Sequence, residues 1–468
     1  MKRWNLILLF LAIANCFIEA TNLKVAGIFG NHMVLQQQTR TPIWGWADAG
    51  TTVKVTSSWN NKSCLVRAGK NGEWKVVLET PEAGGPYDLT VSADRAITFE
   101  DVYIGEVWLA SGQSNMAMQL KECYESTKAI LEAKKGNVRF VNVPAVGSYK
   151  PLTDIEADWV PIAPENVGCC SAVAWYFAHF IQQYLDIPVG IINASYGGSV
   201  VEGWMSRETC STLDGISVPE LSDGTTEWWE ANIPTTMYNG MLNPIVGYGI
   251  QGCIWYQGES NVYNVPRYSD HLVAMVAEWR EKWGRDFPFY YTQIAPFDYS
   301  IWNIPGEVGA YLRDEQRKCM DRVKNSGMAV ILDVGKVEQI HPVRKEKVGE
   351  RLGLMALSEV YGLKGFEYKS PRYDRMELDG DKAVIYFKDL CFGLTSYGKK
   401  LTLFEVADDG KVFHPAEAYV DEERGIVVVH SKYVKEPKAV RYAFKNYVEP
   451  ELFSLSGLPV SSFRTDNW

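Results

Sequence analysis

The chain has no run of lysines and arginines, and this lack of clustered positive charge limits its partners. Its 468 residues contain 47 Lys and Arg against 57 Asp and Glu, which gives a formal net charge of -10. Nucleic-acid binders normally carry a basic face or stripe, so no nucleic-acid partner is expected. The negative net charge does not exclude an anionic small molecule as a ligand. Fields beyond about 10 Å are screened by salt, so arginines near the site decide whether an anion binds.

Metal-binding and phosphate-binding motifs are missing as well. The sequence contains no His-Glu-x-x-His, no Cys-x-x-Cys and no phosphate-binding P-loop. Cysteines are too sparse for a disulfide-built scaffold and are expected mostly as small buried groups, with one disulfide left open. The chemistry is therefore expected to come from ordinary side chains, without a metal or cofactor.

Long hydrophobic runs are absent after the first twenty residues. Lys2 and Arg3 precede the apolar run 6–13, and small-residue cleavage character follows at Ala20. This pattern predicts a secretory signal peptide cleaved near Ala20 and a secreted or periplasmic protein. The competing interpretation is a lipoprotein acylated at Cys16. No later stretch reaches the roughly 18 apolar residues of a transmembrane helix.

Aromatic residues, by contrast, are plentiful, with 16 Trp and 25 Tyr. Rings of this kind stack on the apolar faces of sugars, and they also favour β-strands, so a sugar-handling protein and a large β-rich core are both indicated. Trp228 and Trp229 lie in a polar segment and could stack on a sugar, although packing in the core is the more ordinary role.

Three kinds of pattern succeed one another along the chain after the signal peptide at 1–20. Residues 21–100 contain short strands separated by turns, which predicts a β-sandwich-like domain. Residues 101–365 alternate apolar strands with amphipathic helices, among them 268–283 and 344–361, which predicts an α/β domain with a mainly parallel sheet. Residues 366–468 are β-rich again. Ligands of such parallel sheets bind beyond the carboxyl ends of the strands.

The first candidate for chemistry is Ser114. The apolar strand that begins at Val107 runs into Ser111-Gly112-Gln113-Ser114-Asn115, so the hydroxyl of Ser114 could project above the sheet edge. Backbone N–H groups beside it would suit an oxyanion. Taken alone, this segment is equally typical of a helix N-cap.

Two later segments strengthen the catalytic interpretation. Gly197 and Gly198 follow a strand and allow a close backbone approach, and Asn261 follows another strand and offers an amide donor. Acyl transfer needs two or three donors aimed at one oxygen. The N–H of Ser114, a glycine N–H and the Asn261 amide would supply them.

The base is expected to be His341. Of the six histidines, His341 alone lies in a loop between a predicted strand and a predicted helix of the α/β domain. Glu338, three residues earlier, could orient the imidazole as the acid of a triad does. Asp333 at the strand end and a backbone carbonyl are the alternatives.

These segments, in the order Ser, Gly, Asn, His, resemble the four blocks of the SGNH hydrolases, and more closely the sialate O-acetylesterase family. The resemblance rests on Gly105–Trp108 with Gly112–Met116, Ser195–Gly198 with Trp204, Trp255–Asn261, Ile340–Pro342, Met33–Gln36, and Gly457–Pro459 with Phe463–Asp466. It covers almost the whole mature chain. Glu338 departs from the pattern, because SGNH hydrolases usually carry Asp there.

The resemblance implies a flavodoxin-like three-layer catalytic domain and a serine esterase that needs no cofactor. Ser114 would be the nucleophile, His341 the base, and Ser114, Gly198 or Gly197, and Asn261 the oxyanion hole. The expected substrate is an acetylated carbohydrate, first of all an O-acetylated sialic acid. Acetylxylan or another plant glycan is the alternative, and a non-catalytic sugar-binding protein is a second one.

Four residues are further candidates for substrate binding. Gln113 and Glu259 belong to the motifs themselves. Arg313 and Arg344 are candidates because a carboxylate such as that of sialic acid is usually bound by a bidentate arginine. The oligomeric state stays open.

Overall fold

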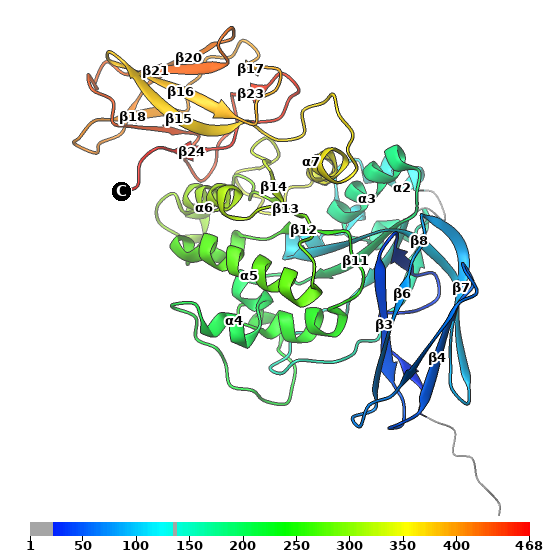
Figure 1. Ribbon diagram of the computed structural model, residues 1–468. Coiled ribbons are helices and arrows are strands. Elements are labelled where there is room, and N and C mark those ends of the chain that lie inside the picture. Colours follow the sequence, from blue (N-terminus) through cyan, green and yellow to red (C-terminus); the bar gives the residue numbers. More distant parts are fainter. Residues whose placement is uncertain (1–21, 134–137) are drawn as a thin grey trace, which may run out of the picture.

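The computed structural model describes residues 22–133 and 138–468. It shows a β-rich region at the start, a sheet flanked by helices in the middle and a second β-rich region at the end (Figure 1). The expected signal peptide, its cleavage point near Ala20 and Cys16 lie outside the described residues. Among the described helices, none combines the length and the apolar character needed to cross a membrane.

The first region consists of short strands whose apolar residues alternate with polar ones. In β4 and β6, for example, Val53, Val55, Trp74, Val76 and Leu78 are buried while their neighbours face solvent. One sheet has the order β1-β3-β6, and β5, β4 and β7 lead to the start of β8. The bounds are β1 Lys24–Val25, β2 Val34–Gln36, β3 Arg40–Trp46, β4 Thr52–Ser57, β5 Ser63–Arg67, β6 Glu73–Glu79 and β7 Gly84–Ser92.

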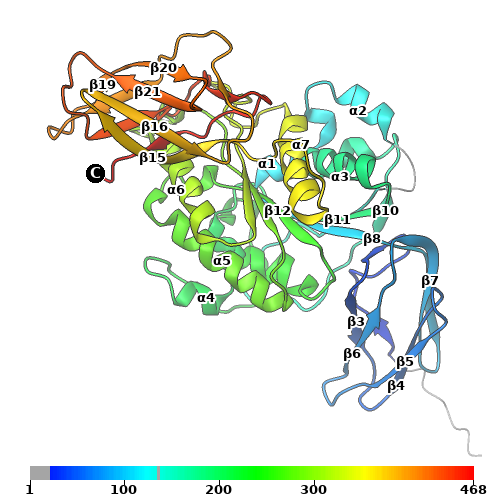
Figure 2. The same cartoon turned by 45° about the horizontal axis from the view of Figure 1, so that its top comes forward.

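Strand β8, Ala96–Gly112, belongs to two regions at once. Its first part pairs antiparallel with β7, and its last part pairs in parallel with β11 and β12 (Figure 2). The expected domain boundary at residue 100 therefore falls inside a strand. No linker separates the regions here, because one continuous backbone serves both sheets.

The central sheet has the strand order β10-β9-β11-β8-β12-β13-β14. All neighbours pair in parallel except β10, which lies antiparallel on the edge. The bounds are β9 Val138–Asn142, β10 Trp159–Pro161, β11 Val189–Ser195, β12 Gly252–Tyr256, β13 Phe289–Thr292 and β14 Ser326–Ala329. Because β8 lies between β11 and β12, their carboxyl ends meet at one edge.

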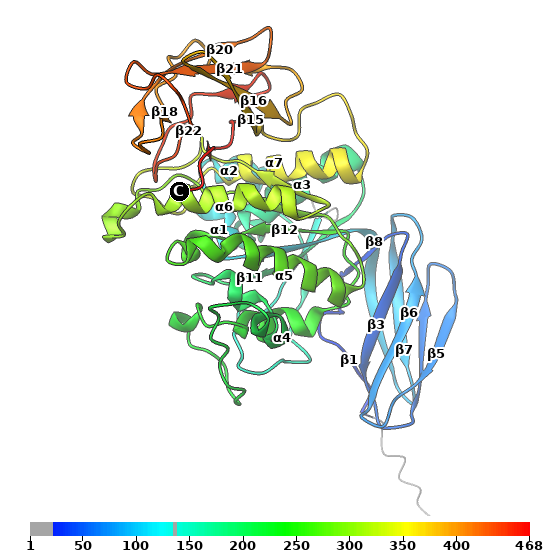
Figure 3. The same cartoon turned by 60° about the vertical axis from the view of Figure 1, so that its left-hand side comes forward.

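Helices cover both faces of this sheet. Cys253 and Trp255 of β12 share a core with α5 and α6, whereas Ile254 and Tyr256 share the other core with α3 and α7. Figure 3 shows α3 and α7 close together above β12. Burial on both faces explains why β12 is apolar throughout. The bounds are α1 Ser114–Ala117, α2 Ser126–Glu132, α3 Ala172–Leu185, α4 Arg207–Ser211, α5 Tyr268–Trp283, α6 Val308–Arg322 and α7 Lys345–Met355.

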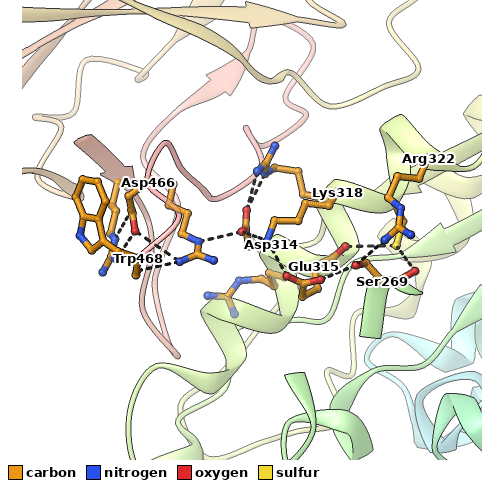
Figure 4. A network of polar contacts seen from close by, with 12 residues as sticks. Ser269, Asp314, Glu315, Lys318, Arg322, Asp466 and Trp468 are labelled. Carbon is orange, nitrogen blue, oxygen red and sulfur yellow. Dashed lines mark hydrogen bonds and ion pairs between the residues drawn. The ribbon is translucent and has the colours of Figure 1, made fainter. Parts of the chain in front are cut away.

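The last region is antiparallel, with sheets ordered β15-β16-β21-β20 and β19-β18-β22-β24 and a separate β17-β23 pair. An ion pair between Asp314 of α6 and Arg464 attaches it to the central region, and within the last region Asp466 binds both Arg464 and Arg441 (Figure 4). The bounds are β15 Arg372–Asp379, β16 Lys382–Lys388, β17 Leu394–Thr395, β18 Phe404–Ala407, β19 His414–Pro415, β20 Glu417–Asp421, β21 Ile426–His430, β22 Ala439–Tyr442, β23 Phe453–Ser454 and β24 Phe463–Arg464.

Candidate active site

Ser114 and His341 meet at the carboxyl edge of the sheet. Ser114 is the first residue of α1, immediately after β8, and His341 lies in the loop between β14 and α7. The distance between His341 Nε2 and Ser114 Oγ is 2.8 Å. This geometry lets Nε2 accept the hydroxyl proton when the imidazole is neutral.

The surroundings of His341 favour that neutral state. Desolvation of the imidazole, and next the positive charge of Lys345, lower the pKa of His341, while Glu122 opposes them. A base that is free of its proton near neutral pH can take the proton of Ser114.

The structure does not bring Glu338 to His341. Lys336 and Gln339 form a β-bridge, and the turn between them holds Val337 and Glu338 out in solvent. No hydrogen bond or ion pair joins a carboxylate to the His341 ring within the described part of the chain. The expected orienting contact of Glu338 is therefore absent here, because the turn directs its side chain outward.

Asp333 is also engaged elsewhere. Arg351 donates two hydrogen bonds to its carboxylate, at 2.6 and 2.8 Å, and Lys347 donates one at 2.7 Å. Burial alone would raise the pKa of Asp333, but these two cations lower it to about 2. Asp333 thus anchors helix α7 to the end of the sheet.

The glycine loop lies directly beside the serine. A Cβ atom placed on Gly197 would lie 3.8 Å from the Cβ of Ser114, and Gly198 has φ +75°, which favours glycine. The backbone of this loop can therefore approach a reacting group at Ser114 closely.

Asn261 is fixed by three hydrogen bonds. Its Oδ1 accepts from the N–H of Val201 at 3.0 Å and from Gln257 Nε2 at 2.6 Å, and its Nδ2 donates to Glu202 Oε2 at 2.9 Å. An amide nitrogen carries two protons, so one remains to be donated. Asn261 also lines the large cleft described below, where that proton would be useful.

Sequence reasoning missed the partners that orient Asn261. His271 of α5 is buried and its Nδ1 lies 2.7 Å from Glu202 Oε1. Burial alone would raise the pKa of Glu202, but hydrogen bonds from His271 and Asn261 hold it below its usual value. No local motif links Glu202 to His271, so only the tertiary structure reveals this pair.

Gln113 and Glu259 connect loops instead of facing a ligand. Gln113 Oε1 accepts hydrogen bonds from the N–H groups of Gly258 and Ser260, at 3.1 and 3.3 Å. Glu259 is buried and accepts a hydrogen bond from Asn115 Nδ2 at 2.6 Å. As candidates for direct substrate contact both are wrong, because burial removes their side chains from the surface.

The two candidate arginines differ in position. Arg313 is wholly buried, and its guanidinium donates to the carbonyls of Lys445 and Asn446 and to Ser462 Oγ. The expectation that Arg313 binds a substrate carboxylate is therefore wrong. Arg344 is exposed just before α7, and its guanidinium lies 5.5 Å from the centre of the Tyr124 ring.

A cleft of about 1170 Å³ lies beside the serine, on the side of Gly197. Trp228 and Trp229 line it and are 74% and 62% exposed, so their expected packing in the core is wrong. None of the described residues that line it is a lysine or arginine. The lining consists of Ala117, Ala145, Ser195, Tyr196, Gly197, Gly198, Val200, Glu202, Gly215, Ile216, Ser217, Trp228, Trp229, Ala231, Asn232, Pro234, Ser260, Asn261, Tyr263 and Asn264.

Comparisons with known proteins agree on one class of enzyme. Residues 104–333 match the model of a family described as carbohydrate esterase, sialic acid-specific acetylesterase. Human sialate O-acetylesterase is 28% identical over 407 residues, which cover 77% of this chain and 76% of the relative. The crystal structure of a carbohydrate acetylesterase from Xanthomonas citri is 33% identical, with a TM-score of 0.87, over 95% of this chain and 100% of that chain.

Proposed function

Because the chain belongs to the family of carbohydrate esterases that includes the sialate O-acetylesterases, we propose that it hydrolyses O-acetyl esters on sugars through a Ser114–His341 dyad. The observation that carries the proposal is the 2.8 Å distance between Ser114 Oγ and His341 Nε2 beside an open cleft. The order Ser114, Gly198, Asn261, His341 and the helices on both sheet faces support an SGNH-type, three-layer catalytic domain.

The proposed reaction has two steps. Ser114 Oγ attacks the acetyl carbonyl while His341 Nε2 takes its proton, and the sugar oxygen then leaves with that proton. Water attacks the acetyl-serine by the same route and releases acetate. The oxyanion in each step accepts hydrogen bonds from Ser114 N–H, from Gly198 or Gly197 N–H, and from Asn261 Nδ2.

Two sugars are candidates. An O-acetylated sialic acid is supported by the names of the relatives, and Arg344 is then the candidate partner for its carboxylate. A neutral acetylated glycan is supported by the cleft, whose described lining offers two exposed tryptophans and no cation. The apolar run 6–13 supports export, which would place the enzyme where extracellular glycans occur.

The test measures acetate release from an acetylated sialoside, an acetylated xylo-oligosaccharide and a small acetyl ester. Ser114→Ala is expected to lower kcat by at least about 10³-fold on all three, because the dyad acts as a unit. Circular dichroism checks that the variant is folded. Near-wild-type activity of the folded variant would refute the assignment.

The same assay separates the sugars. If the enzyme acts on sialosides, Arg344→Met should lower kcat/KM on the sialoside only. Equal rates for wild type and variant on every substrate would remove Arg344 as a carboxylate partner and favour the neutral glycan.

A further inference from the structure

Three buried polar residues lie next to the three parts of the site in the sequence. Asn115 follows Ser114, Glu259 precedes Asn261 by two positions, and Lys345 begins α7 four positions after His341. Asn115 and Lys345 are 0% exposed and Glu259 is 4% exposed. Fully buried lysine and glutamate are rare unless they are paired, so their presence here needs a reason.

Asn115 connects the other two residues. Its Oδ1 accepts a hydrogen bond from Lys345 Nζ, and its Nδ2 donates to Glu259 Oε1 at 2.6 Å. The same Nδ2 donates to the carbonyl oxygen of Ile340 at 3.1 Å, directly before His341. One carboxamide therefore joins the three loops that carry Ser114, Asn261 and His341. They are called the nucleophile, oxyanion and base loops.

The cluster is only partly satisfied. Glu259 Oε2 has no hydrogen-bond partner among the described residues, and Lys345 Nζ lies 4.8 Å from the centre of the Tyr256 ring. Burial raises the pKa of Glu259 and lowers that of Lys345, while the attraction between the two charges opposes both changes. Such an arrangement costs stability, and a partly satisfied network of this kind is expected at functional sites.

The charge of Lys345 also acts on the base. The charged groups that act on His341 are Lys345 from α7 and Glu122 from the 3-10 turn Leu120–Glu122, whereas Glu338 and Arg344 point into solvent. Because no described carboxylate is bonded to the imidazole, the charge of Lys345 is only partly offset at the ring, by the smaller effect of Glu122. It disfavours a second positive charge there.

We propose that Asn115, Glu259 and Lys345 are positioning residues that lock the nucleophile, oxyanion and base loops together, and that the Lys345 ammonium, on the acid side of neutrality, disfavours a proton on His341. Asn115 supplies the geometry, Lys345 supplies the electrostatic bias, and Glu259 holds the Asn115 amide in place. The inference rests on the proposed esterase function and deepens it, since it names the residues that hold the reacting groups in register.

The test is the pH dependence of kcat/KM on the small acetyl ester, which reports the pKa of the base in the free enzyme. Lys345→Met should shift the acid limb of the pH profile of kcat/KM to higher pH by about one pH unit, because a neighbouring like charge is removed. It should also lower kcat by roughly tenfold to a hundredfold through loss of alignment, with little change in KM. Lys347→Met is the matched control, because Lys347 lies on the same helix and pairs with Asp333.

The control should leave the acid limb where it is in the wild type. If Lys345→Met is too unstable to purify, the double variant Glu259→Gln/Lys345→Met buries no charge and gives the same readout. An unmoved acid limb with kcat within about twofold of wild type in these variants would overturn the inference. The measurement needs active enzyme, so its failure is distinct from that of the Ser114→Ala test.

Discussion

Two clusters of buried charge in this protein are built in opposite ways. At the contact between α6 and the last region, Asp314 is paired directly with Arg317, Lys318 and Arg464, at 2.8, 3.2 and 3.1 Å. Below the catalytic loops, Glu259 and Lys345 are linked through the amide of Asn115 alone. The first cluster pairs its carboxylate several times over, while the second leaves a carboxylate oxygen unbonded.

The pKa values follow this difference. Burial alone would raise the pKa of Asp314, but its cationic partners hold it below the usual value, whereas burial raises the pKa of Glu259. The first cluster therefore contributes to the docking of two regions (Figure 4). The second lowers stability at the site where three loops must hold reacting groups, and local conflicts of this kind are expected at functional sites.

The largest effect on stability is expected where the charges are best paired. Asp314→Asn removes the buried anion that Arg317, Lys318 and Arg464 share, leaving Arg464 with Asp466 and Lys318 with Glu315. Breaking a buried pair costs about 3–5 kcal/mol. Urea unfolding should show this loss, while kcat per folded molecule stays at the wild-type value. A large fall in kcat without loss of stability would contradict the division of roles between the clusters.

Asp270→Asn is the control for this variant. Asp270 is also paired with an arginine, Arg322 at 2.7 Å, but its side chain is 59% exposed. Exposed pairs contribute about 0–1 kcal/mol, so the control should unfold close to the wild type. Because the pKa of Asp314 is depressed, its contribution is present above the usual aspartate pKa and is lost as the pH falls through the depressed value.

Much of the architecture could be predicted because local hydrophobic patterns determine it. Helix α5 has the bounds expected from its apolar period, Tyr268–Trp283. The helix expected at 344–361 is an α-helix only for Lys345–Met355, followed by a π-turn at Ala356–Val360. Strand β8 was not expected as one element, because its burial changes from alternating to continuous halfway along.

The candidate site also has a part that could be predicted from the sequence and a part that could not. The approach of Ser114 and His341 could be predicted, since both follow strands whose carboxyl ends meet. Lys345 and Glu259 could not be recognised as a buried pair, because a charged residue at a helix start or in a loop is normally solvated. Arg313 was misplaced for the converse reason, since its partners, at 445–446 and 462, are more than a hundred positions away.

A smaller effect of the opposite sign is expected for the catalytic cluster. The double variant Glu259→Gln/Lys345→Met should raise the free energy of unfolding at pH 7 by about 1–4 kcal/mol, because it removes two poorly paired buried charges. Urea unfolding at several pH values measures this, with Lys347→Met as the control. A variant less stable than the wild type at pH 7 would show that the cluster is a stabilising ion pair, like that of Asp314.

The pH dependence gives this comparison a second readout. The raised pKa of Glu259 makes wild-type stability fall as the pH rises above the usual glutamate value of 4.5. The lowered pKa of Lys345 makes stability rise again as the pH approaches the usual lysine value of 10.5. The minimum between these ranges should vanish in the double variant, whereas the acid-side loss due to Asp314 should stay in both proteins.

The smallest effect is expected for Glu338, a charge that belongs to neither cluster. Glu338 is exposed on a turn, and the described structure gives it no bond to His341. Its charge is screened by solvent, so Glu338→Gln should keep kcat/KM within about twofold of the wild type. His341→Ala is the reference and should lose several orders of magnitude on the same ester. A loss of a hundredfold or more for Glu338→Gln would mean that the turn folds inward when substrate binds and that the dyad works as a triad. In that case the electrostatic bias assigned to Lys345 would act against a carboxylate, and the shift of the acid limb in Lys345→Met would have to be measured again in the Glu338→Gln background.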